Sequence, residues 1–356
     1  MMTEKLKMPL IGVLTAVVSI TLVRLGNPAN MGFCIACFLR DTAGAVGLHR
    51  AAPVQYVRPE IIGIIFGALL VSIFKKEFSP KGGSAPVTRF ILGFALMVGA
   101  LIFLGCPLRM ALRIAGGDFN ALIGLAGFAA GIFSGVFFIK KGYTLKRTYD
   151  VSKTDGILFP LVALILLGLL VIVPSILLIS TQGPGSMRAP VLASLGAGLV
   201  MGAIGFLSKI CFVAGIRDTV LFKDFSMFSV LAALIVAGII GNLIFGSFNP
   251  GFENQPIAHT NGLWNFLGLA MVGLCSVLLS GCPFKQLVLA GSGNSDSAIT
   301  ILGMTTGAAF MHNFGMASSA AGVTANGKTG FVIAFIIVIF IAVYNTFLGR
   351  KAKANE

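Results

Sequence analysis

Long apolar runs are the feature that most constrains how this chain can fold. They recur from one end of the sequence to the other, and each is about as long as the 17 to 25 residues that a helix needs to cross a bilayer. Only 11% of the 356 residues are charged, whereas about 25% are charged in a soluble domain. Because so little polar surface is available, the sequence predicts an all-α polytopic membrane protein.

The apolar runs predict ten transmembrane helices. The expected spans lie near Pro9–Arg24, Ile61–Ile73, Phe90–Leu104, Asn120–Ile139, Leu158–Ser180, Pro190–Leu207, Met227–Phe245, Leu263–Ser280, Ala298–Met311 and Phe331–Leu348. The first run is too long and too continuous for a cleaved secretory signal, so it is interpreted as a span.

The distribution of basic residues predicts the orientation of these spans. The cations that fall on one side are Lys5, Lys7, Lys75, Lys76, Lys81, Arg89, Lys140, Lys141, Lys146, Arg147, Lys153, Arg350, Lys351 and Lys353. Loops on the opposite side, such as residues 247–262, contain no Lys or Arg. Cytoplasmic loops concentrate Lys and Arg, so both termini are expected in the cytoplasm. The same rule accounts for the formal net charge of +14 without a nucleic-acid partner.

Two motifs recur about half a chain apart. Cys34, five residues and Arg-Asp-Thr recur at Cys211, 177 positions later, and Gly-Cys-Pro around Cys106 recurs around Cys282, 176 positions later. The chain is therefore interpreted as a tandem duplication. Five spans per half is an odd number, so the second copy is expected to enter the membrane with the opposite orientation.

This interpretation divides one integral membrane unit into two repeats. The first, residues 1–155, carries Cys34 and Cys106 together with a basic cytoplasmic loop, and the second, residues 156–356, carries Cys211 and Cys282. Cys34 and Cys106 are then expected toward the external side and the other two toward the cytoplasm. The four thiols could line one path.

The segments that carry the repeated cysteines are too short for spans and too apolar for ordinary loops. Met31–Leu39 is brief, and Cys106–Ala115 interleaves arginines with Leu, Met and Ile. Each repeat is therefore expected to contain two short re-entrant helices. Pro107 and Pro283 suit a first helical turn, so each cysteine should lie at a helix start, where free amides and the helix dipole favour an anion or a thiolate.

Basic residues accompany these cysteines at membrane depth. They are Arg40, Arg109, Arg113, Lys209, Arg217 and Lys285. A cation inside a bilayer costs of order 3 kcal/mol, so their recurrence beside thiols indicates an anion pathway. The alternative is that they snorkel or pair with Asp41 and Asp218.

The six cysteines differ in what their surroundings suggest. Cys275 is expected to be a small buried hydrophobe, whereas the four repeated cysteines lie at glycine-flanked breaks in both halves. Cys34 and Cys37 form a Cys-x-x-Cys, which in a soluble redox protein would indicate a dithiol. Ala214 stands where the second half would need the matching cysteine.

Glycines at helical spacing are expected to form packing seams. Gly127, Gly131 and Gly135 lie four residues apart, as do Gly198 and Gly202. Small residues at this spacing let two membrane helices approach closely.

Neither a metal, nor a cofactor, nor an enzymatic activity is expected. Thiols divided between two faces cannot form one tetrahedral site, and His49, His259 and His312 do not flank them. No nucleotide-binding or serine-nucleophile motif occurs in a supporting context. Acids near the repeated segments are few: Asp41, Glu60, Asp118, Asp218 and Asp296. A passive or weakly coupled conduit is therefore favoured.

At these residues the chain resembles the YeeE/YedE family of bacterial inner-membrane proteins, also called the sulphur transport family. The resemblance runs from about Pro9 to Leu348. It is closest to the YedE branch, which is associated with selenium transport, in the run Cys34–Gly44 and in Gly47–Ala52. Gly-Cys-Pro at 105–107 and 281–283 matches the other family signature.

The resemblance implies uptake of a small sulfur or selenium anion, thiosulfate in the YeeE branch, across the bacterial inner membrane. Cys34, Cys106 and Cys282 would be relay thiols, and Cys211 is added by the repeat. The remaining expected path residues are Cys37, Arg40, Arg109, Arg217 and Lys285. A soluble cytoplasmic sulfur or selenium carrier is a candidate partner. Arg50 and Arg58 are assigned either to an external selectivity element or to fixing their loop.

Two competing functions remain open. A membrane thiol oxidoreductase would pass electrons through Cys34 and Cys37 to another protein. A membrane scaffold would recruit a soluble sulfur or selenium enzyme to the basic loop Lys140–Lys153, although topology already explains those charges.

Overall fold

The computed structural model describes residues 4–348 of the chain. Within this range ten helices are long, between 16 and 22 residues. They are α1 (Glu4–Arg24), α3 (Pro59–Phe74), α4 (Pro86–Phe103), α6 (Phe119–Lys140), α7 (Lys153–Ile172), α8 (Val191–Ser208), α10 (Ser226–Ile244), α11 (Gly262–Leu278), α13 (Ser295–Asn313) and α14 (Ala325–Val343). Each predicted span overlaps one of them, so the all-α polytopic membrane fold is confirmed.

The long helices differ in hydropathy. Nine segments of the described residues are long and apolar enough to cross a membrane. Helix α13, which contains the span predicted at Ala298–Met311, lies in none of them, because it carries Asp296, His312 and several serines and threonines. It is the most polar of the ten predicted spans.

The span predicted at Leu158–Ser180 is too long at its C-terminal end. Helix α7 ends at Ile172, and Pro174 then begins the 3-10 turn η2 (Pro174–Ile176). Proline has no amide hydrogen, so it cannot continue the hydrogen-bond ladder of the preceding helix.

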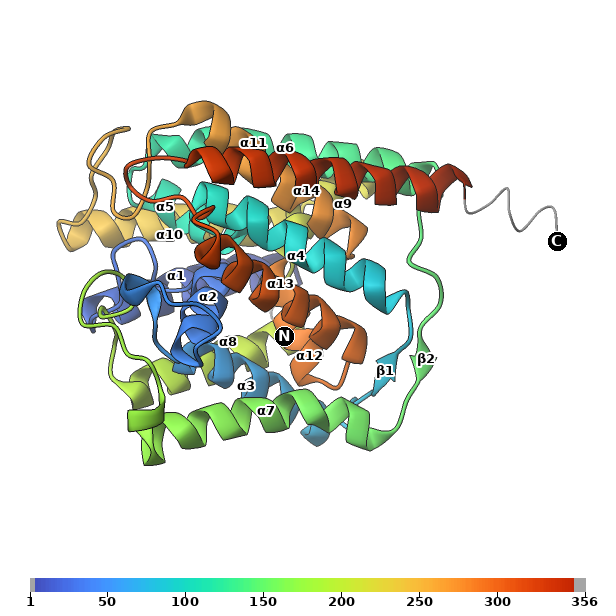
Figure 1. The fold of residues 1–356 in the computed structure, drawn as a ribbon, viewed down its shortest axis with the longest axis horizontal. Helices are drawn as coiled ribbons and strands as arrows, with labels where there is room; N and C mark the ends of the chain where they lie inside the picture. Colours follow the sequence, from blue (N-terminus) through green and yellow to red (C-terminus); the bar gives the residue numbers. More distant parts are fainter. Residues whose placement is uncertain (1–3, 349–356) are drawn as a thin grey trace.

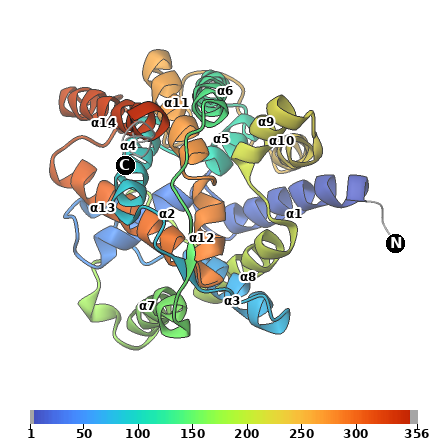
Figure 2. The same cartoon turned by 90° about the vertical axis from the view of Figure 1, so that its right-hand side faces the viewer.

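Four further helices in the described residues have only nine or eleven residues. They are α2 (Ile35–Ala45), α5 (Pro107–Ala115), α9 (Phe212–Phe222) and α12 (Pro283–Gly291). Each begins directly after one of the repeated cysteines, which are Cys34, Cys106, Cys211 and Cys282. The expectation that each of these cysteines lies at a helix start is confirmed. In the view turned by 90° from that of Figure 1, α2 and α12 lie in the interior, with α7, α10 and α14 at the periphery (Figure 2).

The order of long and short helices repeats. From α1 to α7 the order is long, short, long, long, short, long, long, and α8 to α14 have the same order. The four most extensive helix pairings are α1 with α10, α3 with α8, α4 with α13 and α6 with α11. Helices seven places apart correspond in this order, so α1 corresponds to α8 and α3 to α10. Under this correspondence the pairing of α1 with α10 becomes that of α8 with α3, and the pairing of α4 with α13 becomes that of α11 with α6.

Glycines make these pairings close. Gly127 and Gly131 of α6 lie against backbone carbonyl oxygens of α11, and Gly198 and Gly202 of α8 lie against those of α3. A Cβ atom at any of these four positions would collide with the partner helix. Gly135 packs against the Val277 side chain. The predicted packing seams are confirmed.

The two ends of the helix bundle differ (Figure 1). At one end strands β1 (Lys81–Gly82) and β2 (Tyr149–Asp150) pair antiparallel and join the loops that follow α3 and α6. The end of the described chain, at the π-turn η3 (Tyr344–Leu348), lies on the same side. The other end carries loops that include the short turn η1 (Ala52–Val54). Arg350, Lys351 and Lys353, predicted to be cytoplasmic, lie outside the described residues.

Candidate functional site

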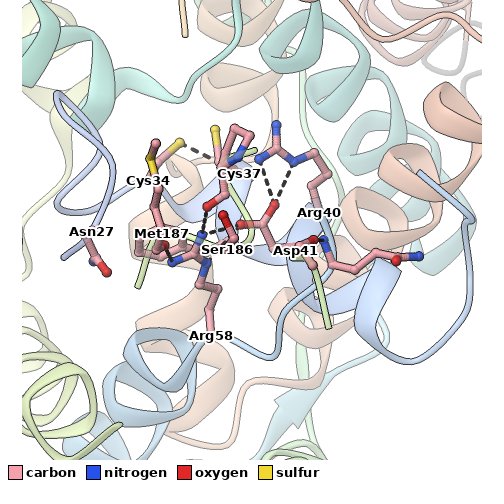
Figure 3. A network of polar contacts seen from close by, with 12 residues as sticks. Asn27, Cys34, Cys37, Arg40, Asp41, Arg58, Ser186 and Met187 are labelled. Carbon is pink, nitrogen blue, oxygen red and sulfur yellow. Dashed lines mark hydrogen bonds and ion pairs between the residues drawn. The ribbon is translucent and has the colours of Figure 1, made fainter. Parts of the chain in front are cut away.

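The N-termini of α2 and α5 meet at three buried thiols, Cys34, Cys37 and Cys106, which we call the first thiol cluster. Each is at most 1% exposed. The backbone N–H of Cys37 donates to Cys34 Sγ at 3.3 Å (Figure 3). The Cys106 thiol contacts that of Cys34 and faces the amide of Ala36, in the first turn of α2. Two helix N-termini therefore direct free amides at the same sulfur atoms.

Arg109 lies beside this cluster and is fully buried. Its Nη1 lies 3.6 Å from Cys37 Sγ and also donates to the carbonyl of Leu104, while Nη2 donates to the Ile257 carbonyl at 3.1 Å. No carboxylate of the described residues lies within ion-pair distance of Arg109. Its charge is therefore met by neutral groups and by the thiols.

Arg40 and Arg58 share one carboxylate near the first thiol cluster (Figure 3). Arg40 donates to Asp41 Oδ1 at 2.7 and 2.9 Å, and Arg58 donates to Asp41 Oδ2 at 2.9 Å. Arg58 also donates to the carbonyls of Pro184 at 2.8 Å and Met187 at 3.0 Å. Of the two roles expected for Arg58, these bonds favour fixing the chain, because they tie α3 to the loop before α8.

The N-termini of α9 and α12 meet in the same way at Cys211 and Cys282, the second thiol cluster. The two thiols contact each other and are at most 2% exposed. The Cys211 thiol faces the amide of Ala214, and the Cys282 thiol faces those of Phe212 and Lys285. The Lys285 ammonium group interacts electrostatically with the Cys211 thiol. Both clusters thus have two facing helix N-termini and a nearby cation.

Other basic residues are paired with acids, as the alternative interpretation expected. Arg217 bonds Asp218 at 2.7 Å, with side chains 20% and 18% exposed. Arg113 bonds Asp118 at 2.6 Å, fully buried, and stacks 4.1 Å from the centroid of the Phe103 ring. Pairing therefore accounts for Arg40, Arg113 and Arg217, but it does not account for Arg109.

A cavity lies near each cluster. The first, which we call the Arg40 cavity, has about 430 Å³ and is lined by Arg40, Leu104 and Ile257 among others. The second, the Lys285 cavity, has about 420 Å³ and is lined by Lys209 and Lys285 among others. Arg40 lies on α2, the short helix that carries Cys37, and Lys285 lies on α12, the short helix that follows Cys282. Each cavity is therefore lined by a cation from a short helix of the adjacent thiol cluster.

Comparison with known proteins bears on these clusters. Residues 207–355 match the family model described as sulphur transport. This part of the chain resembles the sulphur transport family. The matched region contains Cys211, Cys282 and Lys285, so it covers the second thiol cluster, while the first thiol cluster precedes it. A search of curated proteins found no match.

The match to the sulphur transport model and the apolar helices together support a multi-pass membrane protein of sulfur transport. A sulphur transport family implies a transporter rather than an enzyme, and it suggests a sulfur anion as substrate and lipid around the helices. In the described part of the chain all six cysteines are free thiols, and no three His, Cys, Asp or Glu side chains are arranged to hold a metal ion.

Three polar residues of the chain were not selected as path residues from the sequence. Glu60 is fully buried and accepts from Asn27 at 2.8 Å and Ser194 at 3.0 Å, while its second oxygen has no partner among residues 4–348. His312 and Ser318 line the Arg40 cavity. No local motif marks them, because their surroundings are formed by segments far apart in the sequence.

Proposed function

We propose that the protein moves a small sulfur- or selenium-containing anion across the membrane, through the first thiol cluster and then the second. The anion is thiosulfate-like or a selenium species, and it is passed by contact with thiols without any change in covalent bonds. A soft, polarizable sulfur or selenium atom suits contact with S–H groups, while the oxygens of the anion suit helix amides and cations.

The observation that carries this proposal is the environment of Arg109. A buried charge costs several kcal/mol unless an opposite charge offsets it. Asp41 and Asp118 already bond other arginines, and among the described residues Arg109 contacts only carbonyls and Cys37. An anion that enters the first thiol cluster supplies the missing negative charge, so the site favours an anionic ligand over a neutral one.

The second thiol cluster supports the same function at the other half of the chain. Its two thiols also lie between two facing helix N-termini, and Lys285 stands where Arg109 stands in the first half. Neither Arg109 nor Lys285 forms an ion pair with a carboxylate of the described residues. The positive charge at each cluster is therefore available to a bound anion. Several weak sites in series permit release, as conduction requires.

The repeated helix order and the exchanged pairings support two inverted repeats, each with two re-entrant short helices. In this arrangement the first thiol cluster faces the outside, and the second faces the cytoplasm, where the basic loops and both termini lie. Equal numbers of helices in the two repeats favour a division between α7 and α8, whereas the division at residue 155 stays a prediction from sequence. The expected location is the bacterial inner membrane.

The Lys285 cavity suits delivery to a soluble partner. It is lined by Lys81, Lys209 and Lys285, and Lys81 belongs to strand β1 at the end of the bundle that carries the basic loops. A cytoplasmic sulfur or selenium carrier would receive the anion there.

A thiol oxidoreductase is the second candidate. It is favoured by the proximity of Cys34 and Cys37, which interact directly in the first thiol cluster. It predicts that these two residues cycle between dithiol and disulfide during turnover, which alkylation followed by mass spectrometry measures. The proposed conduit predicts that both remain reduced.

The proposed function is tested by uptake of labelled thiosulfate and labelled selenite in cells that lack other importers. Cells with the wild-type protein or with Cys275→Ala, a buried cysteine outside both clusters, should take up one of the anions. Cells with Cys106→Ala should not, at equal abundance in the membrane. No uptake of either anion by the wild-type protein, or full uptake by Cys106→Ala, would refute the proposal.

A further inference from the structure

The Arg40 cavity is built by segments that are distant in the sequence. Helix α2 contributes Arg40, the C-terminal end of α13 contributes His312, and the loop between α13 and α14 contributes Ser318. The turn η1 and Pro184 complete the wall. The remaining lining is largely apolar, so the few polar groups define what the cavity can bind.

Two of these polar groups have no partner in the described part of the chain. His312 Nε2 and Ser318 Oγ are both buried and make no hydrogen bond. Buried polar atoms are nearly always hydrogen-bonded, so two that lack partners in one cavity indicate a missing ligand or water. Arg40 adds a third group, because only its Nε and Nη2 bond Asp41, and Nη1 makes no bond to a described residue.

The ring of His312 is held in place by His49. The two rings stack with centroids 4.7 Å apart. The Ala51 amide donates to His49 Nδ1 at 3.3 Å, so Nε2 is the nitrogen that donates to the Arg40 carbonyl at 3.0 Å. His49 lies outside the membrane-spanning segments, and burial lowers the pKa of its ring, which keeps it neutral. The stack therefore fixes His312 without adding charge.

The charged groups at the cavity are net positive: Arg40 lines it, and Asp41 and Arg58 are joined to Arg40 outside the lining. Arg40 and Arg58 share the single carboxylate of Asp41, so the two guanidinium groups exceed the carboxylate by one charge. Together with the hydroxyl of Ser318 and the ring N–H of His312, this arrangement offers hydrogen-bond donors to an anion.

Arg109 contacts both the wall of the cavity and the first thiol cluster. Leu104 and Ile257 line the cavity, and their carbonyls accept from Arg109, whose Nη1 also lies 3.6 Å from Cys37 Sγ. On α2, Arg40 follows Cys37 by one helical turn. An anion in the cavity therefore lies one layer away from the thiols.

We infer that the Arg40 cavity is a capture site for small oxyanions, in which Arg40, His312 and Ser318 bind the oxygens before any thiol is contacted. The inference rests on the proposed function for the identity of the cargo. Because this site recognises oxygens alone, it should bind sulfate as well as thiosulfate. Discrimination in favour of a soft sulfur or selenium atom then belongs to the first thiol cluster.

Equilibrium binding of labelled sulfate to the full-length protein in lipid nanodiscs tests the capture site. Wild-type protein and Cys106→Ala should bind sulfate alike, and thiosulfate should compete. His312→Ala and Ser318→Ala should each weaken binding about tenfold, because each removes a donor to a charged ligand. Thr306→Ala is the matched control, since its exposed hydroxyl bonds only Leu302 within α13.

Conservative variants separate ligand contact from folding. His312→Gln and Ser318→Thr keep a donor, and at least one should restore most of the affinity. Sulfate binding unchanged by His312→Ala and Ser318→Ala, or absent from the wild-type protein, would overturn the capture site. Sulfate binding with these variant effects, in a protein that transports no anion, would refute the proposed function and leave the capture site standing.

Discussion

Buried arginines in the first half of the chain differ in how their charge is offset. Arg40 and Arg58 share Asp41, and Arg113 has Asp118 to itself. Arg109 has neither acid, although it is fully buried. The unfavourable charge is thus concentrated beside the thiols, where an arriving anion offsets it, and the paired arginines contribute to the stability of the fold.

Asp41→Asn should destabilise the protein strongly. It leaves two buried guanidinium groups without a counter-charge, which costs about 3 to 5 kcal/mol. The repeat supplies a matched control, since Asp218→Asn breaks a pair that is partly exposed and should cost less than about 1 kcal/mol. Thermal unfolding in detergent measures both. Equal losses in the two variants would contradict this account of Asp41.

At the residue scale the sequence predicts the cysteines better than their neighbours. Glycine before and proline after a cysteine are local signals, and they correctly place Cys106 and Cys282 at helix starts. His312 and Ser318 carry no such signal. They reach Arg40 only because the chain between α13 and α14 folds over α2, more than 270 residues away in sequence.

At the element scale the four short helices are defined by what precedes them. Each begins at a cysteine, and its first amides have no carbonyl partner within the helix. Sequence could predict these helices because they are apolar but too short for spans. It could not predict that they meet in pairs, α2 with α5 and α9 with α12, since that depends on packing between distant segments.

Gly131→Ala should weaken the pairing of α6 with α11. The new Cβ would collide with the Ala270 carbonyl oxygen, a backbone atom that cannot move aside, so the helices must separate at a cost of about 1 to 3 kcal/mol. Gly168→Ala in α7 is the control, because nothing lies within 4 Å of the added atom. Unfolding midpoints in detergent compare them. A midpoint unchanged by Gly131→Ala would contradict the proposed seam.

At the scale of the whole molecule the repeated order of long and short helices was foreseeable from two motifs and their nearly equal offsets. The exchange of partners, α1 with α10 and α3 with α8, was not, because no local sequence signal specifies which distant helix a span contacts. The exchange means that neither half packs by itself. We therefore expect the two halves to fold together as one unit.

The proposed inverted arrangement predicts which loops are exposed on each side of the membrane. In intact cells, an impermeant maleimide should label Glu253→Cys, in the loop between α10 and α11, and should not label Arg147→Cys, in the loop between α6 and α7. Both native side chains are exposed, and the six native cysteines are buried, so the background is low. Labelling of Arg147→Cys without permeabilisation would contradict the orientation.

The central claim is that an anion crosses the membrane through both thiol clusters. Its most direct test is entry of labelled thiosulfate and selenite into proteoliposomes that contain the purified protein. We expect the wild-type protein and Cys275→Ala to transport one of these anions, and Cys106→Ala and Cys282→Ala each to abolish its entry while remaining folded. Entry at wild-type rates in both of the cluster variants would contradict the claim.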